Sequence, residues 1–442
     1  MSMPVEESGS NPSQAELRVA TLGPCRFNSP LHRSLNLGQG GGEFTADASR
    51  VLYQIDFLEG ESPPMLAFER AGPREKIFFD PKQTRAAIVT CGGLCPGMNN
   101  VIRSLYYDLK SNYGIAEVLG ILFGYSGLNP TKGRPPMVLT GKDVEEIQHV
   151  GGTILGTSRG PQEPPIMVEF LRELGVNLLF CVGGDGTLRG AHAIAQEAIR
   201  RKLPLSIVGI PKTIDNDIRF CYRSFGFMSA VAEADLVIDR AHVEAKSVEN
   251  GVGLVKVMGR EAGYIAASAT IASGHVNFCL IPELPLVLDG PEGLLAKLKR
   301  RLAARGHAVI VVAEGAGQKL LECGGATDAS GNRKLTDIGP WLKDKFCGYF
   351  AEQSVPVNVR YFDPSYHIRS VSANTADALL CEQLARNAAH AAMAGKTDLL
   401  VSNWNNQFVH VPLAVSTGQP KRINPNSDLW SAVLALTGQD RW

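Results

Sequence analysis

The most constraining stretch of this chain is a strand–helix–strand pattern in which both strands end in polar, acidic turns. An apolar run of strand length, residues 178–182, leads into the sequence GGDGT at residues 183–187. Apolar side chains then recur at three- and four-residue spacing over residues 188–201, which predicts a helix. A second apolar run, 205–210, leads into PKTIDND at residues 211–217. Ligands of open α/β sheets bind at the carboxyl ends of the strands, so both turns are predicted to face one site.

The residue types in the two turns suit the transfer of a charged group. The three glycines of GGDGT leave room for a ligand to approach the backbone, and N–H groups at the mouth of a helix bind phosphate oxygens. Asp185 repels phosphate, so a divalent cation between the two is the natural interpretation. Asp215 and Asp217 point the same way if their turn is extended, and one of them can then take a proton from a hydroxyl. Either turn alone is explained equally well by a glycine turn or by helix-capping aspartates.

GGDGT also occurs in NAD kinases and diacylglycerol kinases, but GGDGT followed by PKTIDND resembles the 6-phosphofructokinases. The resemblance covers residues 84–415, and no tandem repeat is found, as in the single-length form. It implies an α/β fold with two Rossmann-like lobes, mainly parallel sheets, an active site in the cleft between them and a small N-terminal extension. The expected units are an extension (1–82), an ATP-binding lobe (83–226 with 373–442) and a fructose 6-phosphate-binding lobe (227–372). The hinge between the lobes is expected near Gly226.

Four further motifs add to the resemblance. The Gly92-Gly93 turn follows a buried strand, and Arg159 is the one charge in the small-residue loop 150–160. Met258-Gly259-Arg260 follows another strand, and Glu314 ends the next. Each has an ordinary explanation as a turn, a solvated arginine or a surface carboxylate. An arginine among glycines and hydroxyls nevertheless suits phosphate, and a carboxylate at a strand end can hold sugar hydroxyls.

The family pattern implies a role for each matching position. Nucleotide binding is implied for Gly93, Arg159, Gly160, Gly184, Asp185, Gly186 and Thr187. Sugar phosphate binding is implied for Thr213, Ile214, Asp215, Asp217, Met258, Gly259, Arg260, Glu314, Arg360, Tyr366, His367, Ile368 and Arg369. Asp215 is the expected base, with Asp217 as a competing candidate, and Asp185 is the expected Mg²⁺ ligand. Arg159, Arg260 and Mg²⁺ are expected to neutralise charge on the transferred group.

Two positions bear on the phosphoryl donor. Pyrophosphate-using members generally carry aspartate where this chain has Gly186, and that carboxylate would meet the α-phosphate of ATP. Lys212 argues the other way, because it is lysine in pyrophosphate users and glycine in bacterial-type ATP enzymes. Glycine together with lysine is similar to the plant- and trypanosome-type ATP-dependent group, so ATP is the expected donor and pyrophosphate the alternative. An arginine that reaches across subunits in bacterial-type enzymes is Gly251 here, so that contact and the control built on it cannot be transferred. Arg360 can still act across an interface.

Composition narrows the partners and the compartment. The 44 basic and 44 acidic residues cancel, so nucleic acid and anionic membranes are not expected partners. The nine cysteines lack paired spacing and several lie in apolar runs, as buried thiols in a reducing compartment do. No run is long enough to cross a bilayer and no targeting segment is recognised, so a cytoplasmic protein is expected. The resemblance to the phosphofructokinases implies a homo-oligomer, a tetramer or dimer.

Three rival functions are less well supported. A NAD kinase should lack PKTIDND and the later motifs. A non-catalytic regulatory subunit should have lost Asp185, Asp215 or Arg260, and a dehydrogenase should show G-x-G-x-x-G after a strand. The sequence leaves open the effectors, the subunit number and any use of sedoheptulose 7-phosphate.

Overall fold

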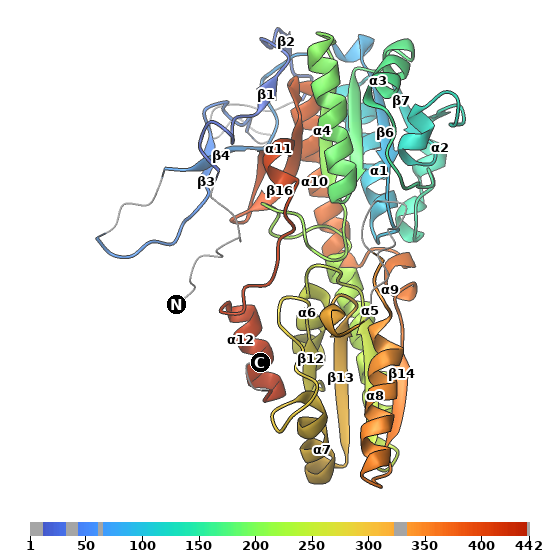
Figure 1. Ribbon diagram of the computed structural model, residues 1–442. Helices are drawn as coiled ribbons and strands as arrows, with labels where there is room; N and C mark the ends of the chain where they lie inside the picture. The colour runs from blue at the N-terminus through green and yellow to red at the C-terminus, as the bar shows by residue number, and fades with distance from the viewer. Residues whose placement is uncertain (1–11, 32–42, 61–64, 322–333, 440–442) are drawn as a thin grey trace.

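A computed structural model describes residues 12–31, 43–60, 65–321 and 334–439 of the 442-residue chain. Figure 1 shows two lobes, one above the other, each built on its own sheet with helices against its faces. The expected α/β class with two lobes and mainly parallel sheets is confirmed.

The upper lobe in Figure 1 is organised around a nine-stranded sheet. Its strands lie in the order β3 (Arg50–Leu52), β4 (Ala67–Arg70), β17 (Gln407–Pro412), β16 (Leu399–Trp404), β10 (Ser206–Pro211), β9 (Leu178–Gly183), β6 (Arg85–Thr90), β7 (Glu117–Ile121) and β8 (Met137–Val138). The central pairs β16–β10, β10–β9, β9–β6 and β6–β7 are parallel. Gly183 lies opposite Pro211, and Val182 opposite Thr90. Three strands therefore end together, and their following turns share one edge.

Helices cover both faces of this sheet, which explains why its central strands are continuous apolar runs. Every residue of β9 and β10 is buried. On one face α1 (Met98–Tyr107) packs with α10 (Thr375–Met393), and on the other α3 (Pro164–Glu173) packs with α4 (Asp185–Arg200). Among the described residues, no helix combines the length and the apolar character needed to cross a membrane.

The lower lobe is built on a four-stranded, fully parallel sheet. Its order is β12 (Phe278–Leu280), β13 (His307–Ala313), β11 (Gly251–Val257) and β14 (Asn358–Phe362). One face packs on α5 (Phe227–Lys246) and α6 (Tyr264–Ser273), and the other on α7 (Leu294–Arg305) and α8 (Ile338–Glu352). Val257 lies opposite Ala313, so the turns that contain Arg260 and Glu314 leave the sheet side by side.

The chain passes between the lobes at Gly226, which precedes α5. Gly226 has φ 90°, and a Cβ there would lie 2.0 Å from the Cys95 sulfur, so only glycine fits. Asp377 at the start of α10 ties this junction, because it accepts hydrogen bonds from the Ser229 N–H (2.7 Å) and hydroxyl (2.6 Å). The two lobes therefore meet where α5 begins.

The last helix, α12 (Asp428–Thr437), does not follow the expectation that residues 373–442 lie on the ATP-binding lobe. It packs against α6 and β12 of the lower lobe, as Figure 1 shows. Gln439, just after it, accepts a hydrogen bond from the Cys279 N–H (2.7 Å) and donates one to the Cys279 carbonyl (3.2 Å). Apolar side chains show that a helix packs somewhere, but not on which lobe. Strand β17, which runs antiparallel to both of its neighbours, β16 and β4, is also not predicted by the sequence.

The described part of the N-terminal extension enlarges the upper sheet through β3 and β4, and β4 pairs with β17. Glu69 on β4 is buried and lies 3.1 Å from Lys396, 3.2 Å from Arg74 and 3.1 Å from His410. Burial alone would raise the pKa of Glu69, but His410 and Lys396 lower it to about 2. Burial also lowers the pKa of His410, so at neutral pH its uncharged ring binds Glu69 through Nδ1 (3.1 Å), while Lys396 and Arg74 supply the opposite charge.

We expect Glu69→Gln to destabilise the protein by about 3 kcal/mol, because it leaves buried cations without their counter-ion. A carboxyl group whose folded pKa is depressed stabilises the protein above its ordinary pKa of 4.5, and that stability is lost as the pH falls toward 2. The variant should lack this pH dependence. Urea unfolding between pH 7 and pH 3 measures both effects, with the exposed Glu75→Gln as a control that should change stability by less than about 0.5 kcal/mol. Equal stability of Glu69→Gln and wild type would contradict the prediction.

Candidate active site

The GGDGT sequence forms the start of α4 rather than a separate turn. Gly184 is the N-cap and Asp185 the first helical residue, three positions before the expected start. At Gly183 a Cβ would lie 2.2 Å from the Thr187 hydroxyl oxygen, so that glycine is required by packing. At Gly186 a Cβ would meet nothing within 4 Å. The first-turn N–H groups of a helix have no intrahelical acceptors, so this end of α4 suits phosphate.

The PKTIDND turn is not extended, so the condition under which Asp215 and Asp217 would point the same way is not met. Asn216 has φ 54°, and the Asp215 N–H donates to the Thr213 hydroxyl (3.1 Å). Ser224 holds the turn from below: its N–H donates to the Asn216 side-chain oxygen (3.0 Å) and its hydroxyl to the Thr213 carbonyl (2.7 Å). Asparagine tolerates this left-handed backbone better than most residues, so the turn folds back on itself.

Asp215 is the most unusual group at this edge. Its Oδ1 is buried and has no hydrogen-bond partner among the described residues. Burial raises its pKa well above the ordinary value, and the charges of Asp217 and Glu314 act in the same direction, whereas Arg260 and Lys212 oppose them. Burial also raises the pKa of Asp217, which a hydrogen bond from Thr213 opposes. Groups of the lower lobe, Glu314 and Arg260, therefore act on an aspartate of the upper lobe.

Gly93 is where further predicted residues converge. A Cβ on Gly93 would lie 3.5 Å from an Arg159 guanidinium nitrogen and 3.6 Å from one of Arg369. Lys212 is buried beneath this turn, and its ammonium donates to the Gly93 carbonyl (2.7 Å). Burial lowers the pKa of Lys212. Lys212 therefore supports the Gly93 turn from one side, and the guanidinium groups of Arg159 and Arg369 lie beside Gly93.

The lower lobe supplies Arg260 and Glu314 from adjacent strand ends. The Glu314 N–H donates to the Val257 carbonyl (2.9 Å), and the Gly315 N–H donates to the Gly259 carbonyl (3.0 Å). Gly259 has φ 129°, a conformation that favours glycine. Burial raises the pKa of Glu314, and Arg260 followed by Lys256 oppose the shift.

Not all predicted residues are brought together. Arg360 is exposed on the edge strand β14, opposite Gly253 and well before the strand end that leads to Arg260. Tyr366 is 76% exposed, and the Arg369 guanidinium stacks on its ring at 4.5 Å. His367 is exposed. Tyr366 thus lies beside Arg369 at the Gly93 turn, and the roles of all the predicted site residues remain predictions. The remaining predicted positions lie in or beside the turns already described, namely Gly160, Thr187, Ile214, Met258 and Ile368.

The site fits a magnesium ion carried by a nucleotide. Asp185 is 41% exposed at the mouth of α4, where it pairs with Arg189 (3.0 Å) and lies 3.5 Å from the Gly418 N–H. Among the described residues, no group of three or more His, Cys, Asp or Glu side chains could enclose a metal ion. Mg²⁺ commonly takes one or two carboxylates together with substrate phosphates and water, and Asp185 can supply such a carboxylate.

Sequence reasoning missed Lys421. It lies between α11 (Leu413–Ser416) and α12, is buried, and its backbone N–H donates to the Asp217 carbonyl (2.8 Å). Its charge opposes the burial that raises the pKa of Asp217. No motif or periodicity marks this segment, so only the structure could have found it.

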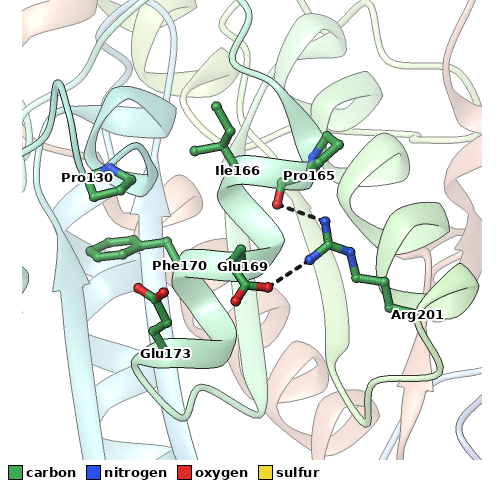
Figure 2. Close-up of a pocket in the computed structure, with 7 residues that line it drawn as sticks. All are labelled: Pro130, Pro165, Ile166, Glu169, Phe170, Glu173 and Arg201. Atoms are coloured by element: carbon green, nitrogen blue, oxygen red, sulfur yellow. Dashed lines mark hydrogen bonds and ion pairs between the residues drawn. The ribbon is translucent and has the colours of Figure 1, made fainter.

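A surface hollow beside α3 is separate from these residues. Figure 2 shows Phe170 and Glu169 of α3 lining it, with Arg201 paired with Glu169 (2.9 Å) and donating to the Pro165 carbonyl (3.1 Å). None of the predicted site residues lines it. It therefore does not contribute to the site at the strand ends.

Comparison with known sequences gives matches over most of the chain. A family model described as Phosphofructokinase matches residues 85–392. An ATP-dependent 6-phosphofructokinase of Borreliella burgdorferi is 44% identical over 433 residues, which cover 96% of this chain and 97% of that protein. ATP-dependent 6-phosphofructokinase 5, chloroplastic, of Arabidopsis thaliana is 47% identical over 370 residues (84% and 68%). The ATP-dependent 6-phosphofructokinase of Trypanosoma brucei brucei is 45% identical over 435 residues (96% and 88%).

Solved structures share the fold. The pyrophosphate-dependent phosphofructokinase of Marinobacter aquaeolei matches with a TM-score of 0.65 and 20% identity, over 81% of this chain and 92% of that chain. At this identity the likeness concerns the fold alone. The relatives from a plant and a trypanosome agree with the resemblance drawn from Gly186 and Lys212.

Proposed function

The chain belongs to the phosphofructokinase family, and on that premise we propose that it transfers the terminal phosphoryl group of ATP to the 1-hydroxyl of fructose 6-phosphate. The products are fructose 1,6-bisphosphate and ADP, and the step belongs to glycolysis. The curated relatives described above carry the name ATP-dependent 6-phosphofructokinase, which supports ATP over pyrophosphate as the donor.

One structural observation supports this function most directly: the buried, unpartnered Oδ1 of Asp215 lies at the edge where both lobes meet. A carboxylate without a partner is ready to accept a hydrogen bond from a substrate hydroxyl. Its raised pKa makes it a stronger base than an ordinary aspartate once it is ionised. Asp215 accepts the proton of the 1-hydroxyl in this proposal, and Asp217 shapes the turn beside it.

The other residues position the substrates and stabilise charge. Arg159 above the Gly93 turn and Arg260 beside Glu314 neutralise charge that develops on the transferred group. Glu314 holds sugar hydroxyls, and Arg369 holds the sugar phosphate. Asp185 holds Mg²⁺, which supplies charge neutralisation on the nucleotide phosphates when it is bound. Phosphoryl transfer depends mainly on positioning and charge stabilisation, so these groups suffice.

The pyrophosphate alternative has one observation in its favour, the lysine at position 212. In the structure the Lys212 ammonium donates a hydrogen bond to the Gly93 carbonyl. This contact explains the presence of a lysine whichever phosphoryl donor the protein uses. The open space at Gly186 favours ATP, because nothing there obstructs the α-phosphate. A NAD kinase or a non-catalytic subunit fits the curated relatives less well.

We also propose a cytoplasmic homo-oligomer. The balance of 44 basic and 44 acidic residues supports small-molecule partners rather than nucleic acid or membranes. The exposed Arg360 on an edge strand supports an oligomer in which a second copy completes the sugar phosphate site. Sedimentation and a compartment-resolved assay test these points.

The function is tested by initial rates at saturating fructose 6-phosphate and Mg²⁺, with either ATP or pyrophosphate as donor. We expect kcat/KM for ATP to exceed that for pyrophosphate by at least about a hundredfold, the size of a difference of roughly 3 kcal/mol in transition-state stabilisation. Faster turnover with pyrophosphate would reverse the choice of donor. Absence of turnover with both donors would exclude the proposed reaction.

A further inference from the structure

A short segment, residues 417–423, connects the two lobes a third time, after the crossing at Gly226 and the return between β14 and α10. It leaves α11 on the upper lobe and leads to α12 on the lower lobe, and Figure 1 shows it as the dark red connection between them. We call this segment the strap. It contacts the Asp185, Asp217 and Arg260 regions in turn, as the following contacts show.

On the upper lobe, Lys421 binds the chain just after Asp215 through both its backbone and its side chain. The Lys421 N–H donates to the Asp217 carbonyl (2.8 Å), and its ammonium donates to the carbonyls of Cys221 (2.5 Å) and Tyr222 (3.1 Å). Earlier in the strap, the Gly418 N–H lies 3.5 Å from an Asp185 carboxylate oxygen. Lys421 is only 8% exposed. Burying an ammonium group is costly, so these contacts are a specific feature of the turn.

On the lower lobe, the next two residues of the strap bind the start of α6. Arg422 pairs with Glu261 (2.5 Å), and its carbonyl accepts a hydrogen bond from the Tyr264 hydroxyl (2.9 Å). The Ile423 N–H donates to Glu283 (2.8 Å), and the same carboxylate accepts the Gly263 N–H (3.0 Å). All these partners surround the turn that follows Arg260. The strap therefore links the base-bearing turn to the arginine-bearing turn through consecutive residues.

We propose that Lys421 is a positioning residue for phosphoryl transfer: it fixes the Asp215–Asp217 turn and, through Arg422 and Ile423, aligns it with the Arg260 turn of the other lobe. This inference rests on the proposed function. Proton acceptance by Asp215 and charge neutralisation by Arg260 must act on the same substrate at once. A misplacement of about 1 Å between such groups can cost about a hundredfold in rate without weakening substrate binding to the same degree.

The Lys421 ammonium also lies over the Tyr264 ring, 5.0 Å from its centroid, in a cation–π contact. The ammonium is therefore located between the two turns that Lys421 is proposed to align. The charge of Lys421 lowers the pKa of Asp217, against the rise that burial causes. The charged groups that act on Asp217 are Lys421, Asp185 and the neighbouring Asp215. A neutral side chain at position 421 would remove the cation from this group and both of its bonds to the Cys221 and Tyr222 carbonyls.

Lys421→Met tests the proposal, because methionine keeps the length and apolar stem but not the charge. We expect kcat to fall about thirty- to a hundredfold, while KM for ATP and for fructose 6-phosphate each change by less than about threefold. Lys297→Met is the matched control, since Lys297 on α7 is 9% exposed and remote from the strap. The control should keep wild-type kcat. Thermal unfolding of both variants reports whether they are folded.

Wild-type kcat in folded Lys421→Met would overturn the proposal, and so would KM increases that account for the whole loss of kcat/KM. If Lys421→Met does not fold, Arg422→Gln replaces it, because the Arg422 side chain is 50% exposed. We expect Arg422→Gln to lower kcat about three- to tenfold, and adding Glu261→Gln should cause no further loss, because the two residues share one contact. Unchanged kcat in Arg422→Gln overturns the proposal. Wild-type turnover is measured first, so an inactive wild type is recognised as failure of the proposed function itself.

Discussion

Gly186→Asp is expected to lower kcat/KM for ATP about a thousandfold while KM for fructose 6-phosphate changes little. Like charges about 4 Å apart at an effective dielectric near 20 repel by roughly 4 kcal/mol, which corresponds to about a thousandfold in affinity. The structure makes the test clean, because a Cβ at Gly186 meets nothing within 4 Å. The fold should therefore accept the side chain, and the loss should arise where the α-phosphate of ATP binds. Initial rates with varied ATP measure it.

Gly186→Asn is the matched control, because asparagine has the shape of aspartate without its charge. If repulsion dominates, the asparagine variant should keep most of the ATP activity, and if bulk dominates, both variants should fail alike. Full ATP turnover in folded Gly186→Asp would contradict this account of donor choice. Binding of fructose 6-phosphate, measured separately, should be unchanged in both variants.

Asp215→Asn should reduce kcat by a hundredfold or more, about the contribution of a general base. The change removes the basic oxygen but keeps the size of the side chain. A neutral amide costs less to bury than a carboxylate, and Asp215 Oδ1 has no hydrogen-bond partner to lose among the described residues, so folding should not be harmed. Because burial raises the pKa of Asp215, the acid limb of the wild-type kcat/KM profile should lie above the ordinary aspartate value of 3.8. Single-turnover rates at saturating substrates separate this effect from binding.

Asp217→Asn is the parallel variant that separates the two candidate bases. Its carboxyl group accepts a hydrogen bond from Thr213, so its loss should disturb the turn and affect kcat less than the loss of Asp215. A larger fall in kcat for Asp217→Asn than for Asp215→Asn would assign the base to Asp217. Equal, small effects in both would exclude either as the base.

The strand–helix–strand unit was predictable because its strands are continuous apolar runs. The structure gives β9 as Leu178–Gly183 and β10 as Ser206–Pro211, within a residue of the predicted ends. The start of α4 was missed because glycines are unfavourable inside helices, whereas the first turn, which lacks intrahelical acceptors for its N–H groups, accepts them. Local residue types reveal strands and helix bodies better than the exact point at which a helix begins.

The site was predictable in its residue types but not in its geometry. The structure brings Asp215, Arg260 and Glu314 close enough to influence one another's charge, and their roles in binding and catalysis stay predictions. The left-handed backbone of Asn216 was missed, because it depends on Ser224. Lys421 was missed because its partners are distant in sequence. Contacts between remote segments leave no periodic trace in the chain.

The upper sheet is completed only by segments that lie on either side of the lower lobe in the sequence. Strand β10 pairs in parallel with β16, and β4 pairs with β17, so two of its internal edges stay open until the chain returns after residue 362. The four strands of the lower sheet, by contrast, come from one continuous stretch. During synthesis the lower sheet can therefore form as it emerges, before α12 is added to it, whereas the half-built upper sheet exposes unpaired edges. This interval is when the chain is most open to aggregation and to chaperone binding.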